Sequence, residues 1–384
     1  MLSLGQLLAA CAAETARASF ADPPSGLVNF ANWPYYLDRD GTPTNGPGPF
    51  RPSLEEFTDR TGIVVNYREV IPDAESFFQM IEPSLAAGEP TGWDVAVITN
   101  GSTLTKMIEL GYLEELPSDR RPNFDRFAAD EVKDPVYDPG NAHTMAWQSG
   151  ITGIAYNPAF TGRPVTSITD LFSDEFAGKV GMFGDNVDLP NLALIALGVD
   201  PADSNEADWR AAADKLRKQR ADGVLRGYYK QNYLRALANG ELALSMAWSG
   251  DVFQQNVDGD PEGMQFVVPD EGALFWTDAM CVPAHAQHPA DAIALMDFVF
   301  DPEIAATIAA WVNYITPVPQ AQDVLLARAD ETDDAEEAAS LRAVAESPLV
   351  FVSEEDRARL RSYRELRMAD ELTLWDEVFG EFYL

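Results

Sequence analysis

The sequence is poor in the residues on which most metal sites and many enzymes depend. Its 384 residues include three histidines and two cysteines, and Cys11 and Cys281 lie far apart without a Cys-x-x-Cys or Cys/His pattern. These counts argue against a zinc site and exclude a framework of several disulfides. The sequence also lacks G-x-S-x-G, H-E-x-x-H, a phosphate-binding loop with lysine, and G-x-G-x-x-G after a strand. We therefore expect no enzymatic activity, no metal and no cofactor.

Positive charge is scarce as well. Lysine and arginine number 27 against 62 aspartates and glutamates, which gives a formal net charge of -35. Such a surface repels nucleic-acid phosphates and anionic lipid head groups and concentrates cations around it. We expect no nucleic-acid partner. High solubility or a saline habitat also accounts for such an excess, so the charge permits a cationic ligand without identifying one.

Long apolar runs are absent too, and none approaches the ~18 residues that a membrane-spanning helix needs. The N-terminus carries one short pattern, in which Leu8-Ala9-Ala10-Cys11 resembles a bacterial lipobox. We interpret residues 1–26 as a signal and lipoprotein tether, with Cys11 as the lipidation site and a periplasmic or cell-surface location. No basic residue precedes Cys11 and the apolar run is short, so a misplaced start or an accidental match stays open.

The chain is too long for one compact core of ordinary size, so we expect two lobes. Apolar runs that fit buried strands alternate with helix patterns, which is typical of an α/β fold. The clearest runs are Leu27–Ala31, Ile63–Val70, Asp94–Ile98 and Val180–Phe183.

Two segments, Met145–Asn157 and Met280–Pro283, are predicted to cross between the lobes. We place lobe 1 at residues 27–150 plus 280–345, and lobe 2 at residues 151–279 plus 346–384. Small ligands bind preferentially at such junctions, so we expect the ligand cleft there.

Two finer expectations concern helices. Ala74–Ala87 fits a helix, and Pro83 within it is expected to kink or split it. The charged stretch Glu354–Phe382 has helical spacing.

Aromatic and acidic residues gather at predicted strand and helix ends. The segments are Trp33–Tyr36, Gly184–Asp188, Trp248–Asp251, Phe275–Asp278 and Asn313–Pro317. Aromatic faces attract cations with about 0.5–2 kcal/mol each, and carboxylates add charge-assisted hydrogen bonds of roughly 1.5–3 kcal/mol each. A linear diamine or triamine needs both, because acids bind its ammonium groups and aromatic walls cover its methylenes. Any one segment is a weak signal, because a tryptophan near a strand end is more often part of the core, but five segments, three of them with an acid, are harder to explain by core packing.

At these residues the sequence resembles the spermidine/putrescine-binding proteins of bacterial ABC importers. The resemblance runs from about Leu27 to the C-terminus. Its landmarks are NW-x-x-Y at Asn32–Tyr36, WDVAV at Trp93, TS-x-x-DLF at Thr166, W-x-G at Trp248, EGALFWTDAMCVP at Glu271–Pro283, and Y-x-TP at Tyr314.

The resemblance implies a two-lobed type II periplasmic-binding fold that closes on a polyamine and delivers it to the permease and ATPase subunits of an importer. It also implies a monomer. The implied aromatic box is Trp33, Tyr36, Trp248, Trp276 and Tyr314. Asp185 and Asp188 are implied to hold one amine end, and Asp278 an interior or distal ammonium. Thr99, Asp251 and Glu365 complete the implied site.

The sequence departs from this family at two positions, since Tyr35 replaces an acid and Gly101 an aromatic residue. Asp251 is a putrescine-type feature and Trp276 beside Asp278 a spermidine-type feature, so the choice of polyamine stays open. Three alternatives also stay open. They are a receptor of the same fold for another organic cation, a sensor that couples to a regulator, and a hydrolase that uses Asp185 and Asp188.

Overall fold

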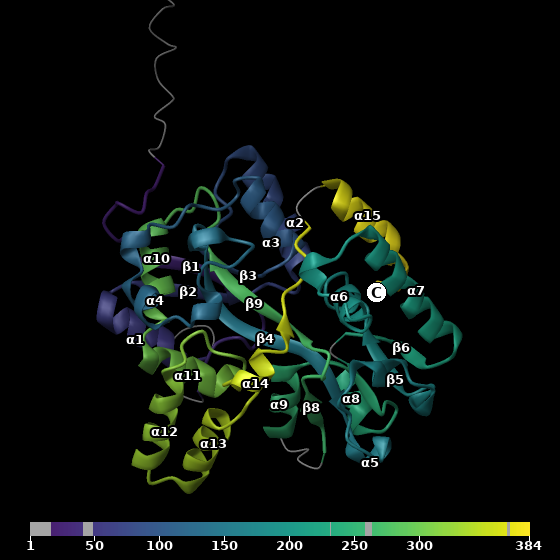
Figure 1. Ribbon diagram of the computed structural model, residues 1–384. Coiled ribbons are helices and arrows are strands. Elements are labelled where there is room, and N and C mark those ends of the chain that lie inside the picture. The colour runs from purple at the N-terminus through teal and green to yellow at the C-terminus, as the bar shows by residue number, and fades with distance from the viewer. Residues whose placement is uncertain (1–16, 41–48, 231, 258–262, 367–368) are drawn as a thin grey trace, which may run out of the picture.

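The computed structural model describes residues 17–40, 49–230, 232–257, 263–366 and 369–384, so Cys11 lies outside the described residues. The fold is mixed α/β with two lobes, as the sequence predicts (Figure 1). No helix in these ranges is long and apolar enough to cross a membrane.

One sheet runs through both lobes in the order β2-β1-β3-β9-β4-β7-β5-β6, with β8 beside β4 and β10 beside β9. Its strands in lobe 1 pair in parallel around β1, and those of lobe 2 pair in parallel around β5. The strands are β1 (Leu27–Asn32), β2 (Val64–Glu69), β3 (Val95–Thr99), β4 (Thr144–Tyr156), β5 (Val180–Phe183), β6 (Leu225–Tyr229), β7 (Leu244–Trp248), β8 (Gln265–Val267), β9 (Ala273–Cys281) and β10 (Leu360–Arg361).

Strands β4 and β9 join the two halves. All 13 residues of β4 are buried, and β9 pairs antiparallel with β4 on one side and with β3 on the other. The register sets Gly150 opposite Trp276 and Gln148 opposite Asp278. Because side chains alternate along a strand, Gly150, Thr152, Trp276 and Asp278 share one face of the crossing strands.

Lobe 1 has two buried apolar clusters around β1 and β3. One contains Phe30 and Trp147, and the other contains Phe77 and Ile98. Its helices are α1 (Pro52–Thr61), α2 (Ala74–Ala87), α3 (Ser102–Glu109), α4 (Pro122–Phe127), α10 (Pro289–Phe298), α11 (Pro302–Val312), α12 (Ala321–Glu331) and α13 (Ala335–Ala345).

Lobe 2 has a separate core that contains Phe183, Trp209, Tyr233 and Phe379. Its helices are α5 (Pro158–Thr161), α6 (Asp188–Ile195), α7 (Glu206–Ala221), α8 (Tyr233–Ala238), α9 (Ser249–Val257) and α15 (Ala369–Phe379). In Figure 1, α15 lies across from α2 and α3 of lobe 1.

The two finer helix predictions are wrong in part. Helix α2 continues through Pro83 without a break, and Pro83 itself is exposed. Glu354–Phe382 is not one helix, because it contains a short helix α14 (Glu354–Arg357), strand β10 and then α15. Pairing of β10 with β9 overrides the local spacing, and Tyr363 is buried in the connection after β10 that has no regular secondary structure.

Candidate functional site

Three aspartates, Asp278, Asp251 and Asp188, lie where the two lobes meet, each held by hydroxyl or indole donors. Asp278 and Asp188 are buried and Asp251 is partly buried. Tyr314 marks the junction, since its ring packs against the cores of both lobes. The three aspartates and their donors are called the acid–tyrosine cluster below. Its donors are Tyr36, Thr99, Thr152, Tyr233, Trp248, Tyr314 and Tyr363.

Asp278 is placed by strand β9, opposite Thr99 at the end of β3. The Tyr36 hydroxyl donates to its Oδ2 at 2.7 Å, and the Thr99 hydroxyl donates to its Oδ1. Burial raises the pKa of Asp278 to about 6, and the two hydrogen bonds offset only part of that increase. The carboxylate is therefore ionised at neutral pH at a cost in desolvation.

Asp251 lies in the first turn of α9, where the partial positive charge of the helix N-terminus favours an anion. The hydroxyls of Tyr314 and Tyr233 donate to its two oxygens at 2.9 and 3.0 Å. Burial raises its pKa, and these two hydrogen bonds lower it. Tyr314 thus bridges from lobe 1 to an acid of lobe 2.

Asp188 lies in the first turn of α6 and accepts three hydrogen bonds. Tyr363 donates at 2.6 Å, Thr152 at 2.8 Å, and the Trp248 indole N–H at 2.9 Å. Burial raises the pKa of Asp188 and the three donors lower it. The Trp276 indole N–H donates to the Thr152 hydroxyl at 3.1 Å, which connects the aromatic wall to this acid.

The aromatic walls of the site rest on two glycines. The Tyr314 ring lies 5.6 Å from Tyr36 at 89° and 5.5 Å from Trp276 at 54°. A Cβ on Gly150 would come within 2.2 Å of the Trp276 ring, and one on Gly250 within 2.4 Å of the Tyr314 ring. Any side chain at either position would displace a wall, which explains the glycine of the W-x-G motif physically.

The cluster lacks a cation within the part of the chain that the structure describes. There, no lysine, arginine or histidine forms a hydrogen bond or ion pair with Asp188, Asp251 or Asp278. Desolvated carboxylates with only neutral donors favour a bound cation, because a cation is the missing source of compensating charge. The arrangement therefore fits a ligand with several ammonium groups and an apolar chain between them.

Some predicted site residues have other contacts. Asp185 accepts the backbone N–H groups of Val187 and Asp188 and so caps α6, and its second oxygen is buried without a partner among the described residues. Burial, then the charge of Asp188, raises the pKa of Asp185 to about 7. Trp33 donates its indole N–H to the Val97 carbonyl and packs inside lobe 1.

Glu365 accepts a hydrogen bond of 3.1 Å from Thr105 on α3 and therefore links lobe 2 to lobe 1. The two carboxylates of the hydrolase alternative have different partners, since Asp185 accepts backbone N–H groups at the start of α6 and Asp188 accepts from Thr152 and Tyr363. The remaining predicted residues, Tyr36, Thr99, Asp188, Trp248, Asp251, Trp276, Asp278 and Tyr314, are brought together in the cluster or its walls.

Three residues of the cluster were not predicted from the sequence. Thr152 lies two residues after Gly150 on β4, so strand alternation could have found it. Tyr233 opens α8, far from the aromatic landmarks, and Tyr363 follows β10. No local pattern singles out the last two, since only the tertiary fold brings them to Asp251 and Asp188.

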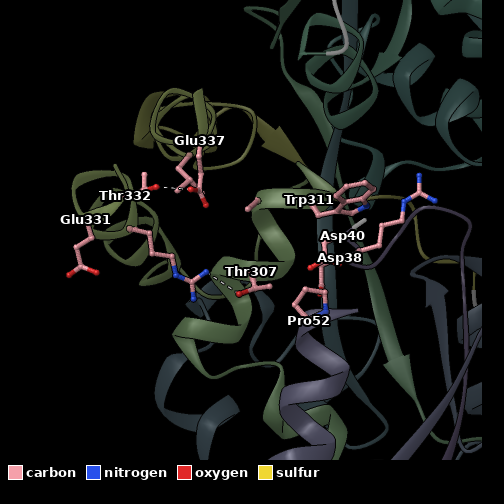
Figure 2. Close-up of a pocket in the computed structure, with 12 residues that line it drawn as sticks. Asp38, Asp40, Pro52, Thr307, Trp311, Glu331, Thr332 and Glu337 are labelled. Carbon is pink, nitrogen blue, oxygen red and sulfur yellow. Dashed lines mark hydrogen bonds between the residues drawn. The ribbon is translucent and has the colours of Figure 1, made fainter. Parts of the chain in front are cut away.

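A separate cavity of about 570 Å³ lies in lobe 1, and its lining includes no residue of the acid–tyrosine cluster. It is lined by the segment around Asp38 and Asp40, by Trp311, and by α12 and α13 (Figure 2). Two of its acids have partners of their own: Asp38 accepts from Ser53, and Glu337 accepts from Thr332 at 2.6 Å. We assign no ligand to it.

Comparison with known proteins gives a consistent set of relatives. The profile of the family described as bacterial extracellular solute-binding protein matches residues 53–340. The chain is 30% identical over 313 residues to spermidine/putrescine-binding periplasmic protein 1 of Haemophilus influenzae, covering 81% of this chain and 80% of that one. It is also 30% identical over 298 residues to the putrescine-binding periplasmic protein SpuD of Pseudomonas aeruginosa, covering 73% and 76%.

Solved structures share the fold. The spermidine/putrescine ABC transporter substrate-binding protein PotD of Streptococcus pneumoniae superposes with a TM-score of 0.75 at 22% identity, covering 93% of this chain and 98% of that one. The Tp0655 lipoprotein of Treponema pallidum superposes with a TM-score of 0.72 at 19% identity, covering 93% and 99%.

Proposed function

The chain belongs to the bacterial extracellular solute-binding proteins, and from that premise we propose that it captures a polyamine, spermidine or putrescine, for an ABC importer. Relatives named for binding spermidine or putrescine support the ligand class. The observation that carries the proposal is the set of three carboxylates held only by neutral donors.

The chemistry of a polyamine matches this set. Its ammonium groups would meet Asp278, Asp251 and Asp188, and its methylenes would lie against Trp276, Tyr314 and the other rings. Micromolar affinity requires about 8 kcal/mol. Two or three charge-assisted contacts of roughly 1.5–3 kcal/mol each, with aromatic walls of about 0.5–2 kcal/mol each, suffice after desolvation.

Closure of the lobes would couple binding to transport. The donors of Asp278 come from lobe 1, whereas Asp188 and Asp251 belong to helices of lobe 2. A ligand that pairs with these acids and lies against Tyr36 and Tyr314 of lobe 1 contacts both lobes, so it binds the closed form better than the open form and shifts the population toward closure. Hydrogen bonds from Tyr314 to Asp251 and from Asn313 to Gln254 (2.6 Å) would add to the closed state.

We assign lobe 1 to residues 27–150 plus 280–345 and lobe 2 to residues 151–279 plus 346–384. The closed monomer would be recognised by a permease, which works with an ATPase, on the outer side of the membrane. Residues 1–26 would serve as signal and tether, with a lipid on Cys11. A quaternary amine fits less well, because it needs an aromatic cage and fewer acids.

Titration calorimetry on the full chain tests the ligand class. We expect one-to-one binding of spermidine or putrescine at micromolar or tighter affinity, and no heat from glycine betaine, whose quaternary nitrogen cannot donate hydrogen bonds to the carboxylates. Spermine in the same series shows how affinity depends on the number of amines in the ligand. No detectable binding of spermidine, putrescine or spermine would contradict the proposal.

A further inference from the structure

Tyr35, beside the site, has an unusual backbone conformation. Its φ is 59°, in the left-handed region. The other described non-glycine residues with positive φ are Asp134, Asn141, His285 and Asn313, all of types that tolerate it. Pro34 precedes Tyr35 in the turn, and the third position of a turn with this pattern ordinarily takes glycine or asparagine. A bulky aromatic residue here is strained, and such strain often accompanies a functional constraint.

The Tyr35 side chain has a defined contact although it is 67% exposed. The Arg39 guanidinium lies 5.1 Å from the centre of the Tyr35 ring and 4.9 Å from the Trp311 ring. Both distances are within the range of cation–π attraction. Arg39 therefore connects the turn after β1 to the C-terminal end of α11, and the three side chains are called the Tyr35 stack below.

The Tyr35 stack joins two of the segments that supply tyrosines to the cluster. Tyr36 follows Tyr35 directly and donates to Asp278, and Tyr314 follows Trp311 by three residues and donates to Asp251. The two rings meet edge to face at 5.6 Å. The Asn32 side chain spans the turn, since its amide donates a hydrogen bond to the Tyr36 carbonyl at 3.3 Å.

We propose that Tyr35 is a positioning residue of the binding site: its ring holds Arg39 against Trp311, and the stack fixes Tyr36 and Tyr314 in the geometry that the ligand-binding carboxylates need. The proposal rests on the proposed function. A turn optimised for stability alone would carry glycine at position 35. Stability and affinity are therefore expected to respond differently to substitution there.

The test compares Tyr35→Gly, Tyr35→Phe and Arg39→Met with wild type, as full chains, by putrescine titration and thermal unfolding. Tyr35→Gly is expected to bind roughly three- to tenfold more weakly because Arg39 loses its contact with the Tyr35 ring and is no longer held against Trp311, with a Tm unchanged or up to about 2 °C higher. Tyr35→Phe, which restores the ring, is expected to recover most of the affinity. Arg39→Met is expected to weaken binding as Tyr35→Gly does, and the double variant no further.

His285→Gly is the matched control, since His285 has a φ of 63° but its backbone N–H binds Glu114 in lobe 1, outside the acid–tyrosine cluster. It is expected to change the Tm without changing affinity. Tyr35→Gly with wild-type affinity, or Tyr35→Phe as weak as Tyr35→Gly, would overturn the proposal. If wild type binds no polyamine, the proposed function fails instead. The coupling between positions 35 and 39, measured by denaturant unfolding of the four proteins, then still decides whether the stack exists.

Discussion

The Asp278→Asn variant is expected to bind polyamine roughly 10- to 100-fold more weakly than wild type while its free form stays at least as stable. The substitution keeps the shape of the side chain but removes the charge that pairs with an ammonium group. A charge-assisted hydrogen bond contributes about 1.5–3 kcal/mol, and each 1.4 kcal/mol corresponds to about tenfold in affinity.

The expected stability has the opposite sign because the charge of Asp278 is uncompensated in the free protein. Burial raises its pKa to about 6, so ionisation at neutral pH costs folding free energy. Asparagine has no such cost, and the hydroxyls of Tyr36 and Thr99 can rotate to donate or accept. Titration calorimetry and denaturant unfolding measure the two effects separately.

Asp297→Asn is the matched control for Asp278→Asn. Asp297 is also a buried aspartate with a raised pKa, but it accepts the backbone N–H groups of Asn123 and Phe124 at the start of α4 in lobe 1. Its replacement is expected to leave affinity unchanged. Wild-type affinity in Asp278→Asn would remove Asp278 from the site.

Affinity for polyamine is expected to fall about tenfold or more between pH 7.5 and pH 5. The pKa of Asp278 is about 6 in the free protein, so this carboxylate is largely protonated at pH 5 and can no longer pair with an ammonium group. The raised pKa values of Asp188 and Asp251 act in the same direction. Asp185, with a pKa of about 7, adds a further proton beside Asp188. The ligand remains fully protonated, so the change originates in the protein.

The stability of the free protein should change in the opposite direction. Each of these groups has a folded pKa above its unfolded value of 3.8, so the folded state binds more protons in the window between about pH 4 and pH 7. Stability therefore rises as pH falls through that window. Reduced repulsion within a chain of net charge -35 adds to the rise.

Thermal unfolding with and without putrescine across pH separates the two contributions. The ligand-induced increase in Tm should shrink as pH falls, while the Tm of the free protein rises. Asp278→Asn should show a weaker pH dependence of affinity than wild type. A constant affinity from pH 7.5 to pH 5 would contradict the role of the carboxylates.

Much of the site could be predicted from the sequence because several of its acids and rings belong to short motifs that carry the family resemblance. The apolar run Asp94–Ile98 predicts a strand that ends at Thr99, and the FWTDAMCVP run of the family resemblance indicates Trp276 and Asp278. The apolar run before the W-x-G motif predicts that the segment Trp248–Asp251 ends a strand, and Trp248 is the last residue of β7. In each case a short local pattern fixes the place of a functional side chain.

The hydrogen-bond partners could not be predicted in the same way. Asp185 and Asp188 look equivalent in the sequence, yet the backbone of the α6 N-terminus takes up Asp185 and leaves Asp188 for Tyr363 and Thr152. The position of Tyr363 depends on the pairing of β10 with β9, which helical spacing in the same stretch conceals. These hydrogen-bond partners depend on tertiary contacts between segments far apart in the chain.

The central claim is that separate carboxylates recognise separate ammonium groups. Titration calorimetry of putrescine, 1-aminobutane and 1,4-butanediol tests it most directly, because the three share a four-carbon chain and carry two, one and no ammonium groups. We expect putrescine to bind at micromolar or tighter affinity, the monoamine roughly 10- to 100-fold more weakly for its one lost charge-assisted contact, and the diol not at all. Equal binding of putrescine and the monoamine would contradict the claim.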